Sequence, residues 1–438
     1  MTTEATGTLR RWVCRVFDVE PDEAGAVLAG FAMFFLLFAG YFMLRPVRET
    51  MGIAGGVDNL QWLFTGTFLA TLAAMPLFGW IAGRVQRRRI LYWVYGFFAS
   101  NLLAFGAGLW LQPDDVWLAR TFYIWLSVFN LIAISVAWSV LVDVFSVSQA
   151  KRLFALMAGG ASLGGLTGPL LGIALVGPLG HGGLVLLAAV LLLASALAAR
   201  RVHHWRDARP LSAGERVQRQ QKLGGSPWAG ATEVLRSPYL MGIAVFVLLL
   251  ASVSTFLYFE QARLVEATYP DPADQTRVFG TIDFIVQSLA ILSQLFITGR
   301  LARTLGVGVL LVGVPLVTAV GFLWLAFAPL FAVLAVVMVV RRAGEYAFVR
   351  PGREMLYTVV APEAKYKAKN FNDTVVYRGA DAVSAWVKAG IDAVASTPMA
   401  AMLIGAGIAV AWGVTGASLA RSHSRRAQPA SASDRQPL

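Results

Sequence analysis

Eight charged residues lie within two apolar stretches of this sequence. They are Arg341, Arg342, Glu345 and Arg350 in the first stretch and Asp373, Arg378, Asp381 and Lys388 in the second, with a basic loop between the stretches. Arg341 and Glu345 are spaced i,i+4, so a helix places them on one face, where they can pair. Arg378 and Asp381 are spaced i,i+3 and can pair in the same way. Lys388 lies two turns beyond Asp381 on that face.

Charged side chains are costly within a membrane span, by a few kcal/mol or more each, so they normally face water or one another and mark a transport path. We therefore expect a polar cavity that binds a small anionic solute, because guanidinium groups match the oxygen geometry of phosphates and carboxylates. The expected substrate ligands are Arg45, Arg48, Arg342, Glu345, Arg378 and Asp381. Further candidates for cavity or proton-carrying residues are Glu49, Asn130, Glu260, Asp283, Gln287 and Lys388.

Three of these assignments have alternatives. Arg45 and Arg48 end the first apolar run, where long basic side chains also snorkel to the membrane interface. That end of the run is expected to be external, however, and arginine is disfavoured there. Glu260 and Arg263 are also compatible with a surface ion pair, and Asp143 with a position at the cytoplasmic interface.

The composition indicates a membrane protein. Of the 438 residues, 57% are hydrophobic and 14% are charged, whereas soluble domains carry roughly 25% charged residues. The net charge of +12 fits cytoplasmic loops of a membrane protein better than a nucleic-acid partner. The single cysteine, Cys14, excludes an internal disulfide and a cysteine metal site. The first apolar run, residues 24–44, is long enough to span and lacks a signal-peptide cleavage site.

Membrane spans need ~20 apolar residues, and twelve candidates are present. They lie at approximately 24–47, 60–82, 90–111, 116–144, 153–176, 183–199, 239–262, 278–298, 306–328, 330–350, 371–394 and 397–419. Alternate loops are basic, which places both termini in the cytoplasm of a bacterial inner-membrane protein. We expect an all-α fold with two six-helix halves, 1–199 and 239–420, joined by a basic linker (200–238) and followed by a disordered tail (421–438).

The linker contains two adjacent histidines, His203 and His204. A metal site there would need carboxylate or cysteine partners at ligand spacing, and the sequence supplies none. We expect instead a solvated segment that faces lipid headgroups.

Two glycine patterns resemble signatures of the major facilitator superfamily. The first is residues 79–89, in which glycines precede a basic cluster; its alternative is a generic basic cytoplasmic loop. The second is Gly160, Gly164, Gly168 and Gly172, spaced by four with Pro169 beside them, which resembles an antiporter signature. Glycine at this spacing also predicts close helix packing, and the two interpretations are compatible.

Three stretches together resemble the ATP/ADP translocase family of nucleotide transporters and its free-living bacterial relatives. They are Leu-Arg at 44–45 followed by Arg-Glu at 48–49, the run 149–156 (Gln-Ala-Lys-Arg-Leu-Phe-Ala-Leu), and 345–357 followed by a lysine-rich loop and Asp-Thr-Val-Val-Tyr-Arg at 373–378. The chain departs from the family where the fourth span offers Leu126 or Asn130 in place of an acidic residue. It also has Asp381 in the eleventh span, where the family has a lysine. The resemblance implies the fold and an exchanger ancestry.

These observations predict a secondary transporter, not an enzyme, that exchanges an anionic, nucleotide-like or otherwise phosphorylated metabolite as a monomer without a cofactor. The sequence has no phosphate-binding loop and none of the short hydrolase motifs, so the energy must come from a solute or proton gradient. The alternative is a proton-coupled exporter of amphipathic or lipid-like molecules. The number of arginines in the spans weighs against that alternative, which would need a wide apolar cavity.

Overall fold

The computed structural model describes residues 19–85, 87–208, 229–395 and 397–427. Throughout these residues the regular structure is helical and no strand occurs, so the predicted all-α class is confirmed. Cys14 and most of the expected linker and tail lie outside the described residues.

Eight helices of the described chain are long and apolar enough to cross a membrane. They are Ala24–Ala54, Val57–Ile81, Arg89–Leu111, Val116–Val144, Ser148–Asp207, Pro238–Thr268, Pro272–Phe327 and Met399–Ala427. Two of them, at 60 and 56 residues, have length for two crossings, since ~20 residues suffice for one. Gly180, at φ 65°, and Gly306, at φ 76°, interrupt the helical backbone within these two, a conformation that glycine adopts without steric cost. Twelve spans with both termini cytoplasmic remain a prediction.

The chain divides into two compact units, each with its own apolar core. Unit 1 comprises Met1–Ala54, Leu77–Gly224 and Asp271–Phe284, and unit 2 comprises Gly55–Pro76, Gly225–Pro270 and Ile285–Leu438. The boundary between the units therefore falls inside two helices, α3 (Leu60–Arg84) and α10 (Pro272–Ser293). The division into two six-helix halves, 1–199 and 239–420, stays a prediction.

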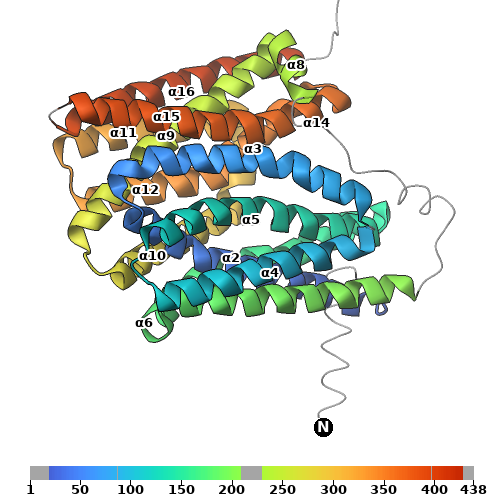
Figure 1. The fold of residues 1–438 in the computed structure, drawn as a ribbon. Helices are drawn as coiled ribbons and strands as arrows, with labels where there is room; N and C mark the ends of the chain where they lie inside the picture. The colour runs from blue at the N-terminus through green and yellow to red at the C-terminus, as the bar shows by residue number, and fades with distance from the viewer. Residues whose placement is uncertain (1–18, 86, 209–228, 396, 428–438) are drawn as a thin grey trace, which may run out of the picture. The chain divides into compact units, whose positions relative to one another are not determined.

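Unit 1 is built on α2 (Ala24–Ala54), α4 (Arg87–Leu111), α5 (Val116–Val144) and α6 (Val147–Asp207) (Figure 1). The glycines of the 160–172 repeat lie on α6, where it packs against α2. A Cβ atom added at Gly160 would lie 2.2 Å from the Phe31 carbonyl oxygen, and one at Gly164 would lie 2.6 Å from that of Phe35. The predicted close helix packing is therefore confirmed, because any side chain at these positions would meet backbone.

Unit 2 contains both charged stretches. Its elements are η1 (Val57–Asn59), the first part of α3, α8 (Ala229–Arg236), α9 (Pro238–Thr268), the end of α10, η2 (Gln294–Thr298), α11 (Gly299–Phe327), α12 (Phe331–Gly344), η3 (Glu345–Val349), α13 (Arg350–Leu356), η4 (Tyr357–Val359), α14 (Pro362–Phe371), η5 (Asn372–Val376), α15 (Tyr377–Val394) and α16 (Met399–Ala427). Of these, η2, η3 and η5 are π-helical turns. Such turns are rare and occur frequently at functional sites. Here η3 begins at Glu345, and η5 directly precedes the turn that carries Arg378.

Candidate functional site

A buried ion pair joins α12 to the start of η3 in unit 2. Arg341 Nη1 donates to Glu345 Oε2 at 3.0 Å, and both side chains are less than a tenth exposed. The same nitrogen donates to Ser254 Oγ of α9 at 2.8 Å. On the other side, Arg350 Nε lies 3.7 Å from Glu345 Oε1. The predicted i,i+4 pairing is confirmed, and Glu345 accordingly lies between two guanidinium groups.

A second ion pair lies on α15. Arg378 Nη1 is 3.5 Å from Asp381 Oδ2, which confirms the predicted i,i+3 pairing. Asp381 is buried and also accepts a hydrogen bond from Thr255 Oγ1 of α9 at 3.2 Å. Arg378 is about a third exposed. Of the two partners, the carboxylate is therefore fixed in the core, while the guanidinium still reaches solvent.

Hydroxyl groups of α9 connect the two charged helices. In addition to the contacts of Ser254 and Thr255, Ser384 Oγ of α15 lies 2.8 Å from Ser252 Oγ of α9. None of these hydroxyl residues was predicted as a site residue. The available signal was the Ser-Val-Ser-Thr run at 252–255, a polar interruption of an otherwise apolar span.

The other predicted residues of unit 2 lie outside the two ion pairs described above. Lys388 is almost fully buried and pairs with Asp392, one turn further along α15, which was not among the predicted residues. Arg342 is buried on α12, and Gln287 is half-buried on α10. Glu260 is 1% exposed and pairs with the half-exposed Arg263, so the pair exists but its carboxylate is not at the surface.

In unit 1, the end of α2 pairs with α10. Arg45 Nε lies 3.6 Å from Asp283 Oδ2, and the Asp283 side chain is 4% exposed. These residues are far apart in the sequence, so no local spacing could have predicted the pair. It joins a predicted substrate ligand to a predicted proton-carrying residue.

Arg48 lies one turn further along α2, against α5. Its guanidinium carbon is 3.9 Å from the centroid of the Tyr123 ring, and its Nε donates to the Tyr123 carbonyl oxygen at 3.3 Å. Its Nη1 donates to Glu49 at 3.0 Å. The side chains of Arg45 and Arg48 are 22% and 17% exposed, so protein groups surround most of each side chain. This burial favours an internal role over snorkelling.

The fourth predicted span contributes little charge. Asn130 of α5 is half-buried, and its Oδ1 has no hydrogen-bond partner within the described residues. Leu126, one turn earlier, is fully buried. Asp143 is half-buried near the end of α5.

His181 connects three segments of unit 1. Its Nε2 lies 2.9 Å from Thr276 Oγ1 of α10, and Thr276 Oγ1 lies 2.7 Å from Thr50 Oγ1 of α2. Burial lowers the pKa of the His181 imidazole below its ordinary value, and this effect exceeds the opposing effects of the Pro272 carbonyl and the Asp271 carboxylate. His181 lies between the predicted spans 153–176 and 183–199, so the predicted topology places it outside the membrane.

The predicted residues thus form two groups. Unit 1 contains Arg45, Arg48, Glu49, Asn130 and Asp283; unit 2 contains Glu260, Gln287, Arg342, Glu345, Arg378, Asp381 and Lys388. In each group, partly buried arginines pair with carboxylates: Arg45 with Asp283, Arg48 with Glu49 and Arg378 with Asp381. Such pairing is how charges persist in a membrane interior.

The sequence model of the Major Facilitator Superfamily matches residues 25–369. The chain belongs to this superfamily. Its members are transporters, so the chain is assigned as a multi-pass membrane transporter and not as an enzyme.

Solved structures of transporters have a similar fold. The nucleoside transporter NupG is 13% identical over 90% of this chain and 98% of its own, with a TM-score of 0.62. The POT family transporter PepTSo is 14% identical over 91% and 98%, with a TM-score of 0.63. A bacterial homologue of the iron transporter ferroportin is 13% identical over 91% and 98%, with a TM-score of 0.65. Identities this low show the fold alone. The comparison with curated proteins found no match.

Proposed function

We propose that the protein is a secondary transporter that exchanges a phosphorylated or otherwise anionic metabolite across a bacterial inner membrane. The observation that carries this proposal is the Arg378–Asp381 pair. Its 3.5 Å separation is wide for a charge-assisted hydrogen bond, which normally measures ~2.7–2.9 Å. Because Asp381 also accepts a hydrogen bond from Thr255, Arg378 can exchange its partner for a substrate oxygen while Asp381 keeps one donor.

The other arginines are also proposed to exchange a carboxylate partner for a substrate oxygen. Carboxylates neutralise Arg45, Arg48 and Arg341. An anionic substrate competes with these carboxylates for the guanidinium groups. A carboxylate that the substrate displaces needs a proton or another hydrogen-bond donor, because an unpaired charge is costly within the membrane. Arg342 supplies further positive charge on α12.

The resemblance to the ATP/ADP translocase family favours a nucleotide-like cargo. The departures at Asn130 and Asp381 lower the positive charge and remove a carboxylate relative to that family. The proposal therefore names phosphorylated metabolites as a class rather than ATP. Twelve spans and cytoplasmic termini belong to the same proposal, as in transporters built from repeats.

Coupling is proposed to be exchange against a second anion or symport with protons. Asp283 is the proposed proton carrier, because its buried carboxylate pairs with Arg45, a proposed substrate ligand. Protonation of this carboxylate would release Arg45 for the substrate, which links proton uptake to anion binding.

The test is uptake into proteoliposomes that contain the full chain. Radiolabelled nucleotides and sugar phosphates serve as substrates, and unlabelled nucleotides or lipids serve as competitors. Arg378→Ala is expected to abolish uptake and Arg378→Lys to retain part of it, since lysine keeps the charge without the planar fork. Arg300→Ala, at an exposed arginine, is the matched control. Full activity of Arg378→Ala, or competition by lipids and not by phosphorylated solutes, would exclude the proposed function and favour the amphipathic exporter.

A further inference from the structure

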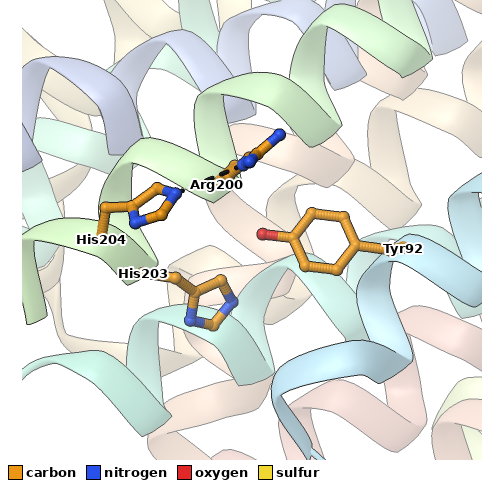
Figure 2. A pocket seen from close by; sticks show the side chains of 4 residues that line it. All are labelled: Tyr92, Arg200, His203 and His204. Atoms are coloured by element: carbon orange, nitrogen blue, oxygen red, sulfur yellow. Dashed lines mark hydrogen bonds between the residues drawn. The ribbon is translucent and has the colours of Figure 1, made fainter. Parts of the chain in front are cut away.

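A cavity of about 300 Å³ lies between α4 and α6 in unit 1, among residues that the proposed transport does not use. It is lined by Tyr92 of α4 and by Arg200, His203 and His204 of α6. Figure 2 shows the Tyr92 hydroxyl pointing toward the space beside the arginine and the two imidazoles. The volume is at the lower end of the ~300–1,000 Å³ typical of small-molecule pockets, which suits a headgroup-sized ligand.

The cavity lies where the surface changes from apolar to charged. On the same helices, within five residues of the lining positions, Trp93 and Phe97 of α4 are 69% and 60% exposed, and Leu197 of α6 is 63% exposed. Large apolar side chains this exposed are expected to face lipid tails. In the other direction, Arg201 and Asp207 are exposed. The cavity is therefore expected at the depth of the lipid headgroups.

The lining groups can all donate hydrogen bonds. Arg200 Nε donates to His204 Nε2 at 3.3 Å, which fixes the guanidinium and leaves its two terminal nitrogens to meet a ligand. The imidazoles of His203 and His204 and the Tyr92 hydroxyl are further potential donors. A phosphate group presents acceptor oxygens in several directions, and a guanidinium binds two of them at once.

A metal ion fits this cavity poorly. The permanent positive charge of Arg200 beside both imidazoles opposes a cation. Within the part of the chain that the structure describes, no group of three or more His, Cys, Asp or Glu residues is placed to hold a metal.

We propose that this cavity binds the phosphate group of an anionic ligand, and that the ligand is an anionic phospholipid of the cytoplasmic leaflet. Basic pockets between membrane helices on the cytoplasmic side bind such headgroups. The apolar surface beside the cavity would carry the acyl chains. The site is separate from the proposed cargo site, so either proposal can fail without the other.

The test measures lipid binding by the purified full chain in detergent, using native mass spectrometry with phosphatidylglycerol, with phosphatidylcholine as the zwitterionic comparison. Arg200→Gln is expected to weaken phosphatidylglycerol binding about tenfold or more, because hydrogen bonds to charged groups are the strong ones. His203→Gln combined with His204→Gln, and Tyr92→Phe alone, are expected to weaken it less. Arg201→Gln is the matched control, since Arg201 is adjacent and does not line the cavity. Thermal unfolding of each variant establishes that it is folded.

A second experiment distinguishes a lipid headgroup from a soluble phosphate compound as the ligand. Inorganic phosphate and glycerol 3-phosphate are titrated against the same variants by thermal shift. If Arg200→Gln loses the response to phosphatidylglycerol and its responses to inorganic phosphate and glycerol 3-phosphate match those of the wild type, the result supports a lipid ligand. A phosphate response lost in Arg200→Gln, without any lipid preference, overturns the lipid assignment. Equal binding of every probe by the wild type and Arg200→Gln overturns the site itself.

Discussion

His181 Nε2 and Thr276 Oγ1 lie 2.9 Å apart and connect the segment around Gly180 to the start of α10. Thr50 Oγ1 of α2 extends the connection at 2.7 Å. Three segments that are remote in sequence are thus held together within unit 1 by one imidazole and two hydroxyl groups. The imidazole changes charge near physiological pH, so this connection is expected to respond to acid.

The first prediction concerns that response. Because burial lowers the pKa of His181 in the folded protein, the unfolded chain binds the proton more readily. Stability is therefore expected to fall as pH drops below the unfolded-state value of about 6.5. His181→Gln keeps hydrogen-bonding groups without titrating. Its melting temperature, measured by tryptophan fluorescence in detergent, should fall less than that of the wild type between pH 7.5 and 5.5.

Other charged residues flank Thr276 and Thr50, so the comparison needs a control. They are Asp271, Asp274 and Arg277 at or just before the start of α10 and Glu49 on α2. Asp274→Asn, which removes a half-exposed carboxylate and leaves His181 in place, should keep the wild-type loss of stability in acid. Parallel pH profiles for the wild type and His181→Gln would contradict the prediction.

The second prediction concerns the glycines of α6. Gly160→Ala would bring a methyl group within 2.2 Å of the Phe31 carbonyl oxygen, and overpacking of this kind costs about 1–3 kcal/mol. The matched control is Gly159→Ala on the same turn, where the nearest atom is a Phe31 ring carbon at 3.7 Å. The control should be neutral or stabilising, since alanine favours helix over glycine. Equal melting temperatures for the two variants would show that α2 is not in backbone contact with α6.

The third prediction compares the partners of the Lys388–Asp392 pair. Their side chains are 3% and 43% exposed, so only the lysine depends on its partner for stabilisation. Asp392→Asn leaves a buried cation without its carboxylate and should destabilise the protein by about 3–5 kcal/mol. Lys388→Met leaves a carboxylate that water can solvate and should cost much less. Denaturant or thermal unfolding of both variants checks the order, and the reverse order would mean that Lys388 is solvated.

The fourth prediction concerns the Arg341–Glu345 pair. Arg341→Met should destabilise strongly, because the buried Glu345 loses the guanidinium that donates to it at 3.0 Å. The double variant Arg341→Met with Glu345→Leu should recover most of that loss, since an apolar replacement of a buried pair is often neutral for folding. Transport should remain abolished in the double variant. A double-mutant cycle of melting temperatures measures the coupling, and additive effects would show that the two residues do not interact.

The sequence predicted the local features of the site. The pairs Arg341–Glu345 and Arg378–Asp381 follow from helical spacing, and the close packing of α6 against another helix follows from glycines every fourth residue. It could not predict that Asp283 pairs with Arg45, because that contact depends on how distant helices pack. The hydroxyls of Ser254 and Thr255 were missed because serine and threonine barely change the hydropathy of an apolar span.

The contact of α6 with α2 also limits where motion can occur. Since the two backbones touch at successive turns, neither helix can slide or rotate against the other without separating the whole seam. Spectroscopic probes attached near Phe31 and Gly160 should therefore keep a constant separation through every step of substrate translocation.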